Sequence, residues 1–244
     1  MRAASSVLDA APERARANDR AFYTGMAVAA ALAVLLGFSR TYYLRPYFQT
    51  TPLATAFRVH GFVFSAWIAL FVAQTSLVAA RRTAIHRKLG WAGACLAVLM
   101  IVVALNAAMH GAQRDIAAGY EEQALSFFTT PVLSMVMFAT LVALAVASRG
   151  RPETHKRLML LATLSLLDAA TARWPIPGIQ DPPFRYYAAA DAFIAAAVLY
   201  DFASRRAISP VYVFGGLAIV AEQWARDALG ATAVWQAFAA RVLE

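Results

Sequence analysis

The stretch "RRTAIHRKLGWAGACLAVLMIVVALNAAMH", residues 81–110, decides the fold. It opens with a histidine among basic residues, and an uncharged, mostly apolar run then extends from Leu89 to Met109. About 20 mostly apolar residues are needed to cross roughly 30 Å of hydrocarbon as a helix. The stretch therefore predicts a transmembrane helix that begins at a basic membrane surface near His86 and ends near His110 at the opposite surface.

Six further runs of this kind indicate an all-α fold, a bundle of seven transmembrane helices. Hydrophobic residues make up 61% of the 244 positions and charged residues only 15%, a balance typical of a chain dissolved in lipid. The fifth run is the weakest, because its uncharged core ends at Asp168. The predicted spans cover residues 21–38, 59–80, 89–109, 124–147, 155–172, 186–203 and 210–229.

The basic residues predict the orientation, with the N-terminus inside and the C-terminus outside. Fourteen of the 22 Lys and Arg residues fall in segments that would then face the cytoplasm, as the positive-inside rule requires. These segments are residues 1–20, 81–88, 149–157 and 205–206. Because the basic residues are split among short loops, the predicted partner is the lipid bilayer and not nucleic acid.

The chain divides into a cytoplasmic tail (1–20), the membrane domain (21–229) and a short amphipathic helix on the outer face (230–244). In this last segment Trp235, Phe238, Ala239 and Val242 recur at helical spacing, and Thr232 is a candidate N-cap. The sequence contains no dinucleotide-binding, P-loop, zinc-protease or nucleophile-elbow motif. Any site must therefore be built from the bundle and its loops, and a second copy or another membrane-complex subunit is an open partner.

Ionisable residues within the predicted spans are the functional candidates, because charge is costly in hydrocarbon. Most of them fall on the outer half of the bundle. Asp201 is the exception, since it lies at the inner end, where an interfacial ion pair with Arg205 or Arg206 would explain it. The outer candidates are His60, His110, Asp168, Asp191 and Glu222, with Arg173 close to Asp168 in sequence.

Counting along the helices places two of these histidines at one level. His60 and His86 are 26 positions apart, or about 39 Å of helix, so they lie at opposite membrane surfaces. The 24 positions from His86 to His110 return about 36 Å to the outer side. We therefore expect His60 and His110 to share an outer level on adjacent antiparallel helices.

Three kinds of site fit this outer end. The two imidazoles could bind the iron of haem b axially, or His60, His110 and Asp191 could hold a transition metal. Asp168, Asp191, Glu222 and Arg173 would then orient the ligands or transfer protons. The third kind is a carboxylate-lined vestibule in a non-enzymatic transporter, sensor or assembly subunit.

Simpler roles compete with each of these sites. In this simpler interpretation the outer histidines are plain interfacial residues, and Asp168 with Arg173 and Glu222 with Arg226 are local ion pairs. Asp191 has no charged partner nearby in sequence, so it is the carboxylate with the strongest claim to a role. Whether any cofactor is bound stays open at this point.

His86 and His155 are weaker candidates for a cofactor site at the inner end. Each begins a similar segment, "IHRKLGWAG" and "THKRLMLLA", with basic neighbours that suit contact with lipid phosphate or a haem propionate. Anchoring of the helix ends at the membrane surface explains both residues without a ligand role.

The segment "RVHGFVFSAWIALFVAQTSLVAARRTAIHRKLG" (58–90), with "THKRLMLL" and "LYDFASRRAISPVYVFGG", resembles a group of bacterial multi-pass inner-membrane proteins with no assigned activity. More distantly, the pattern of an outer His followed by "HRxLG" is similar to transmembrane b-type cytochromes and ferric-reductase-like proteins. That second resemblance implies two His pairs that hold haem, with His60 and His110 as the outer pair and His86 and His155 as the inner pair.

Overall fold

The computed structural model describes residues 2–182 and 184–244, and their side chains from residue 16 onward. All regular structure within these residues is helical. The helices are α1 (Arg2–Phe38), α2 (Arg45–Phe48), α3 (Thr55–Ala79), α4 (Thr83–Ala117), α5 (Glu121–Phe127), α6 (Thr129–Ala147), α7 (Pro152–Leu164), α8 (Asp168–Thr171), α9 (Phe184–Arg205), α10 (Pro210–Gly230) and α11 (Ala233–Leu243). A short π-helical segment, η1 (Ser39–Tyr43), follows α1.

Five of the helical stretches are long and apolar enough to cross a membrane. This confirms the predicted all-α class, and the length and apolarity of these helices suit a membrane protein. The five stretches are Arg16–Tyr43, Thr55–Ala79, Thr83–Ala117, Glu121–Ala147 and Phe184–Arg205. Helix α10 has comparable length but carries Glu222, Arg226 and Asp227 in its second half.

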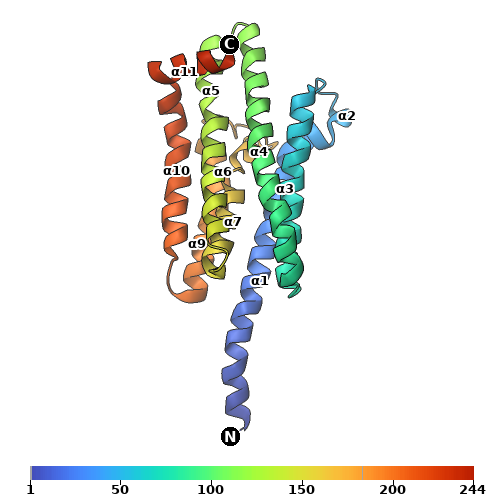
Figure 1. Ribbon diagram of the computed structural model, residues 1–244, viewed down its shortest axis with the longest axis vertical. Coiled ribbons are helices and arrows are strands. Elements are labelled where there is room, and N and C mark those ends of the chain that lie inside the picture. The colour runs from blue at the N-terminus through green and yellow to red at the C-terminus, as the bar shows by residue number, and fades with distance from the viewer. Residues whose placement is uncertain (1, 183) are drawn as a thin grey trace.

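The long helices run side by side, and short turns join them at one end (Figure 1). We call this the basic end, because its turns between α3 and α4, α6 and α7, and α9 and α10 contain or adjoin most of the clustered basic residues. The opposite end is crossed by α11. Helix α1 begins at Arg2, so the predicted tail (1–20) is continuous with the first long helix and extends beyond the basic end.

The fifth predicted span is not one helix. Helix α7 ends at Leu164, the backbone turns through Ser165–Leu167, and α8 resumes for four residues. At about 1.5 Å per residue, the 13 residues of α7 reach only about 20 Å, which is short of the hydrocarbon thickness. The prediction of a continuous helix over 155–172 was therefore wrong.

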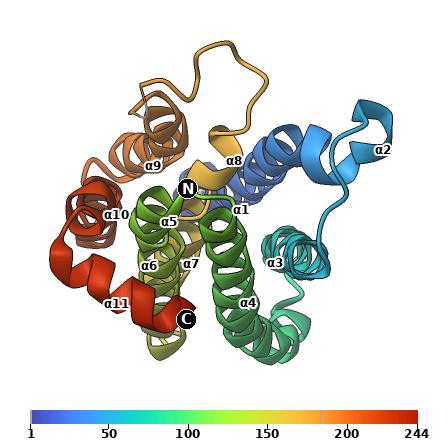
Figure 2. The same ribbon diagram turned by 90° about the horizontal axis from the view of Figure 1, so that it is seen from above.

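Helix α7 is short because it is the core of the bundle. Leu160, Leu161 and Ala162 have no exposed surface, and seen from above α7 lies inside the ring formed by the longer helices (Figure 2). At its centre the Trp67 indole packs edge-on against Phe138 and donates a hydrogen bond to Thr163 Oγ1 at 3.3 Å. A helix that is surrounded by protein does not contact lipid, so its length need not match the thickness of the bilayer.

The close contact between α1 and α8 depends on Gly37. Because Gly37 packs directly on the backbone of Ala170, a Cβ at this position would overlap that carbonyl group. The Trp174 indole holds the same two segments together by donating to the carbonyl of Ala33 at 3.1 Å. The glycine thus sets how deeply α8 and Asp168 sit against the first long helix.

We expect Gly37→Ala to lower the free energy of unfolding by about 2 kcal/mol, because the added methyl forces two backbones apart. Gly25→Ala is the matched control on the same helix, since its Cβ would meet nothing within 4 Å. That control should be neutral or stabilising by about 0.5 kcal/mol, because alanine favours helix. Thermal unfolding of both variants in one detergent measures the difference. Equal melting temperatures would contradict the assigned contact.

Helix α11 packs across the end of the bundle through Trp235, Ala239 and Leu243, which are buried against α4, α5 and the residues that follow α5. The Thr232 hydroxyl accepts the backbone N–H of Trp235, so the predicted N-cap is confirmed. Of the predicted apolar face, Trp235 and Ala239 pack on the bundle, together with Leu243, whereas Phe238 and Val242 are exposed.

Candidate functional site

A buried arginine organises the charged residues on the half of the bundle toward α11. Arg226 on α10 is 2% exposed and binds both oxygens of Glu222, one turn earlier on the same helix, at 2.6 and 2.8 Å. Its remaining terminal nitrogen donates to Asp168, the first residue of α8. The break after α7 brings Asp168 to this position. We call Asp168, Glu222 and Arg226 the Arg226 centre.

The third predicted carboxylate lies beside this centre. Asp191 on α9 accepts a hydrogen bond from Gln223 at 3.0 Å, and Gln223 is the neighbour of Glu222 on α10. The oxygen of the Gln223 amide is buried and has no partner among the described residues. The Tyr187 ring lies 5.9 Å from the Arg226 guanidinium carbon. The structure therefore gathers Asp168, Asp191 and Glu222 in one region, as the helix count predicted.

Arg173 does not pair with Asp168 as its position in sequence suggested. Its guanidinium donates to the carbonyl of Ala169 and lies over the Phe38 ring at 5.0 Å. Asp168 instead finds its cation 58 positions later, on α10. The predicted pair of Glu222 with Arg226 is confirmed.

His60 and His110 are on adjacent helices, α3 and α4, but no hydrogen bond or ring contact connects their side chains. The His60 ring stacks on Phe64 with centroids 4.1 Å apart, and its Nδ1 is buried without a partner in the part of the chain that the structure describes. His110 is exposed, and it makes no hydrogen bond or ring contact with any described residue. Asp191 lies elsewhere, against Gln223. Across residues 16–182 and 184–244, no three His, Cys, Asp or Glu side chains form a metal-binding group.

The two histidines that the sequence ranked lower do come together. The rings of His86 on α4 and His155 on α7 lie 6.3 Å apart, centroid to centroid, and are nearly perpendicular at 81°. Both are half-buried. They meet at the basic end because each stands in the first turn of its helix, four residues after the N-cap. The similar segments "IHRKLGWAG" and "THKRLMLLA" therefore converge in space.

Each of these rings is held by a hydrogen bond at Nδ1. His155 Nδ1 lies 2.8 Å from the carbonyl of Ala145 in the last turn of α6, which also accepts the backbone N–H of Ser148 at 3.1 Å. His86 Nδ1 lies 2.7 Å from the Gln74 side-chain amide, which donates to it while the amide oxygen accepts from the backbone of Gly90. Both rings are thus fixed through Nδ1, and Nε2 is the nitrogen left over on each.

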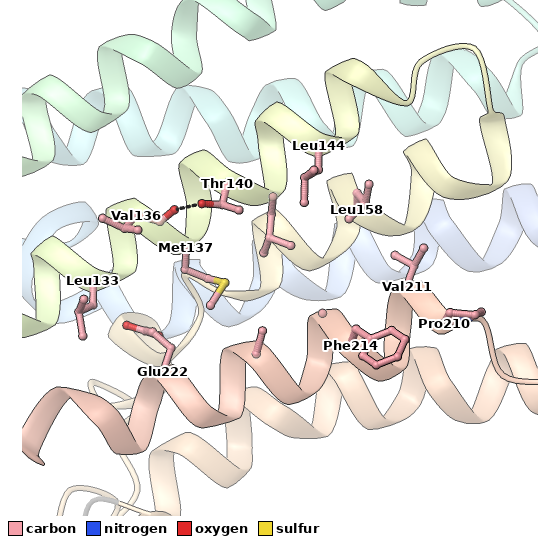
Figure 3. A pocket seen from close by; sticks show the side chains of 13 residues that line it. Leu133, Val136, Met137, Thr140, Leu144, Leu158, Pro210, Val211, Phe214 and Glu222 are labelled. Carbon is pink, nitrogen blue, oxygen red and sulfur yellow. Dashed lines mark hydrogen bonds between the residues drawn. The ribbon is translucent and has the colours of Figure 1, made fainter.

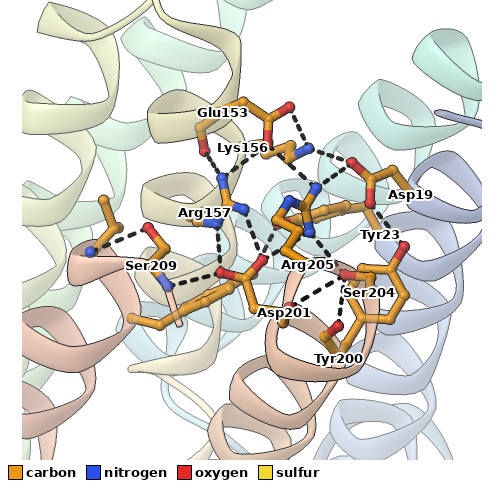
Figure 4. A network of polar contacts seen from close by, with 12 residues as sticks. Asp19, Tyr23, Glu153, Lys156, Arg157, Tyr200, Asp201, Ser204, Arg205 and Ser209 are labelled. Carbon is orange, nitrogen blue, oxygen red and sulfur yellow. Dashed lines mark hydrogen bonds and ion pairs between the residues drawn. The ribbon is translucent and has the colours of Figure 1, made fainter. Parts of the chain in front are cut away.

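Beside the histidines, an extended ion-pair network joins four helices (Figure 4). Asp201 on α9 is fully buried and accepts from Arg157 on α7 at 2.7 Å, from Arg205 at 2.8 Å and from the backbone of Ser209 at 2.9 Å. The predicted partner Arg205 is confirmed, whereas Arg157 was missed. The reason is that Arg157 lies 44 positions from Asp201, so no local spacing connects them.

The network continues to α1 through Asp19. Its carboxylate accepts from Lys156 and from the Tyr200 hydroxyl, both at 2.7 Å, and it also pairs with Arg205. Burial acts to raise the pKa of Glu153, but hydrogen bonds and charge from Lys156 and Arg157 outweigh it, so the pKa of this carboxyl lies below its ordinary value. The network fixes α1, α7, α9 and α10 relative to one another next to the histidine pair.

Comparison with known protein families, curated proteins and solved structures gives no match to this chain, so its function must be argued from these residues.

Proposed function

We propose that the chain is a bacterial inner-membrane protein that crosses the bilayer seven times, with its N-terminus inside and its C-terminus outside. Besides the five long apolar stretches, α10 would form one crossing and α7 with α8 another. A short crossing with a broken backbone is tolerated where protein surrounds it, and α7 is buried. The basic end would face the cytoplasm, in agreement with the positive-inside rule.

Within this topology, we propose that the protein binds haem b or a redox-active transition metal through His86 and His155 and acts in electron transfer. The observation that carries the proposal is the pair of neighbouring imidazoles, whose centroids lie 6.3 Å apart and whose planes are nearly perpendicular. Two imidazoles that share one ion through nitrogen–metal bonds of about 2.0–2.1 Å would have ring centres roughly 6 Å apart. The distant resemblance to b-type cytochromes gives the same expectation for this pair.

The hydrogen bonds at Nδ1 also suit metal ligation. A ligating histidine normally donates its other ring N–H to a carbonyl or carboxylate, which fixes the ring and its tautomer. The Ala145 carbonyl does this for His155. His86 would need the Gln74 amide to turn, so that the amide oxygen accepts from Nδ1. A bound haem or metal would supply one-electron transfer, and the protein would supply the two ligands and their orientation.

The surroundings of His86 favour neutral imidazole, the form that binds metal. Burial, the neighbouring His155 and the positive charge of Arg87 lower the pKa of the His86 ring below its ordinary value. A basic neighbour that suggested lipid anchoring thus also favours a ligand role for His86.

The outer residues would have supporting roles. Asp168, Asp191 and Glu222, with Arg173, are proposed to transfer protons near the outer face, and His60 with its unpartnered Nδ1 is the candidate for a second ligand site together with His110. A non-enzymatic transporter, sensor or assembly subunit is the alternative. The Arg226 centre favours this alternative, because its carboxylates are already paired with Arg226 and could stabilise the fold or bind a solute.

The experiment that tests the redox proposal is a spectrum combined with a metal analysis. Protein purified in detergent from iron-replete cells should show a reduced-minus-oxidised difference in the visible range, or about one equivalent of iron or copper per chain by mass spectrometry. A colourless preparation free of both metals would overturn the proposal and leave the non-enzymatic alternative. Reconstitution with haem in vitro provides the matching positive control.

A further inference from the structure

The apolar groove of about 490 Å³ between α6, α7 and α10 offers little to a polar ligand (Figure 3). Glu222 and Thr140 are the two polar side chains in its lining. Both Glu222 oxygens accept from Arg226, and the Thr140 hydroxyl donates to the Val136 carbonyl. The unpartnered acceptor on α10 lies instead at the next residue, Gln223, whose amide reaches α9.

Gln223 presents a buried acceptor that no described residue satisfies. The residue is 3% exposed, and its Nε2 donates to Asp191 Oδ1 at 3.0 Å. Because an ionised carboxylate only accepts, this contact identifies the amide nitrogen and leaves Oε1 as the atom without a partner among the described residues. The oxygen and nitrogen of one amide are roughly 2.3 Å apart, so Oε1 lies within about 5 Å of the Asp191 carboxylate.

The negative charge of Asp191 is not balanced by a nearby cation. Its partner Gln223 is neutral, and Asp191 forms no ion pair with any residue in the part of the chain that the structure describes. In the Arg226 centre the guanidinium is already shared between two carboxylates. The guanidinium of Arg173 donates to the backbone carbonyl of Ala169 instead. An unpaired carboxylate thus lies beside a buried, unsatisfied amide oxygen.

Both groups lie at one depth in the proposed topology. Asp191 is seven positions after Phe184, and Gln223 is seven positions before Gly230, so each is about 10 Å from the outer end of its helix. A charge at such a depth is costly unless an opposite charge accompanies it. A cation would balance the carboxylate and, at the same time, accept a lone pair from the amide oxygen.

We propose that Asp191 and Gln223 bind an alkali cation, Na⁺ or K⁺, with water completing its coordination. Carboxylate and amide oxygens are the ligands that hard cations prefer. One carboxylate supplies the single negative charge that balances a monovalent ion. A divalent metal is not favoured, because no three His, Cys, Asp or Glu side chains within residues 16–182 and 184–244 form a metal-binding group. The site does not rest on the proposed redox function.

The test is equilibrium binding of radiolabelled Na⁺, and of radiolabelled Rb⁺ as an analogue of K⁺, to the full-length protein. The protein is purified in detergent with N-methylglucamine as the only other cation. We expect saturable binding of about one ion per chain. Asp191→Asn keeps the shape of the side chain but removes its charge, so it should weaken binding at least about tenfold. Gln223→Met removes the amide oxygen and should weaken binding by about three- to tenfold.

Asp227→Asn is the matched control, because Asp227 is an exposed carboxylate on the same helix and forms no ion pair with a described residue. Its affinity for the ion should equal that of the wild type. Thermal unfolding gives an independent measurement, since an ion that binds only the folded protein raises the melting temperature. At equal ionic strength, the bound ion should stabilise the wild type relative to N-methylglucamine and should not stabilise Asp191→Asn.

Three results would overturn the proposal. If neither ion binds saturably, Asp191 holds a proton, or Gln223 holds a water molecule, in place of a cation. Full binding in Asp191→Asn would place the ion elsewhere in the protein. Equal losses in Asp227→Asn and Asp191→Asn would indicate a general effect of net charge. The visible spectrum and metal content are separate readouts, so the redox proposal stands or falls independently of these results.

Discussion

His86→Ala is expected to remove the visible absorbance or bound metal of the purified protein, reducing the cofactor from about one per chain to less than about a tenth of that. Loss of a residue that merely orients a ligand costs about 10–100-fold in metal affinity, so loss of one of two ligands should cost at least as much. His155→Ala should have the same effect, because the two rings lie next to each other, one on α4 and one on α7. Absorbance per chain and metal content measure both variants.

The outer histidines are the controls for this prediction. His110 is exposed and makes no hydrogen bond or ring contact with a described side chain, so His110→Ala should keep the absorbance of the cofactor bound by His86 and His155. Loss of absorbance in His60→Ala and His110→Ala, with His86→Ala intact, would move the site to the outer level that the helix count favoured. Gln74→Glu is a further test of where the cofactor lies. Either oxygen of a carboxylate can accept from His86 Nδ1, whereas the Gln74 amide would first have to turn. It should shift the absorbance maximum or the reduction potential without loss of cofactor.

Much of the fold follows from local sequence. The apolar run after His86 predicted a long helix, and α4 extends from Thr83 to Ala117. The cap at Thr232 and the pair of Glu222 with Arg226 involve residues three or four positions apart, so a helical repeat is sufficient to predict them. Helix counting also predicted that Asp168, Asp191 and Glu222 would gather, because depth in a bundle depends only on rise per residue.

Contacts between distant helices were not predictable in this way. Asp168 pairs with Arg226 and not with Arg173 because the turn at Ser165 changes the direction of the chain before α8. No residue in the apolar run before the turn predicts it. Apolarity also cannot distinguish a lipid-facing helix from a buried one, so the run through α7 resembled a span. The meeting of His86 and His155 depends on which helices are neighbours. The similarity of their flanking segments was the one signal available.

Arg226→Met is expected to lower the free energy of unfolding by about 3–5 kcal/mol, the usual cost of leaving a buried charge without its partner. Arg226 is 2% exposed and Asp168 is 6% exposed, so removal of the guanidinium leaves Asp168 and Glu222 facing each other with little access to water. Thermal unfolding in detergent, followed by circular dichroism or by loss of soluble monomer, measures the change.

The control for this prediction is Arg173→Met, because Arg173 is exposed and donates to a backbone carbonyl instead of a carboxylate. That variant should change stability by about 0.5 kcal/mol or less. The triple variant Arg226→Met, Asp168→Asn, Glu222→Gln removes all three charges together and should recover much of the loss, since neutral amides tolerate burial better than unpaired carboxylates. If Arg226→Met alone were as stable as the wild type, the guanidinium would not be the partner of these carboxylates. If the triple variant were no more stable than the single one, the loss would come from packing around α10 and not from unpaired charge.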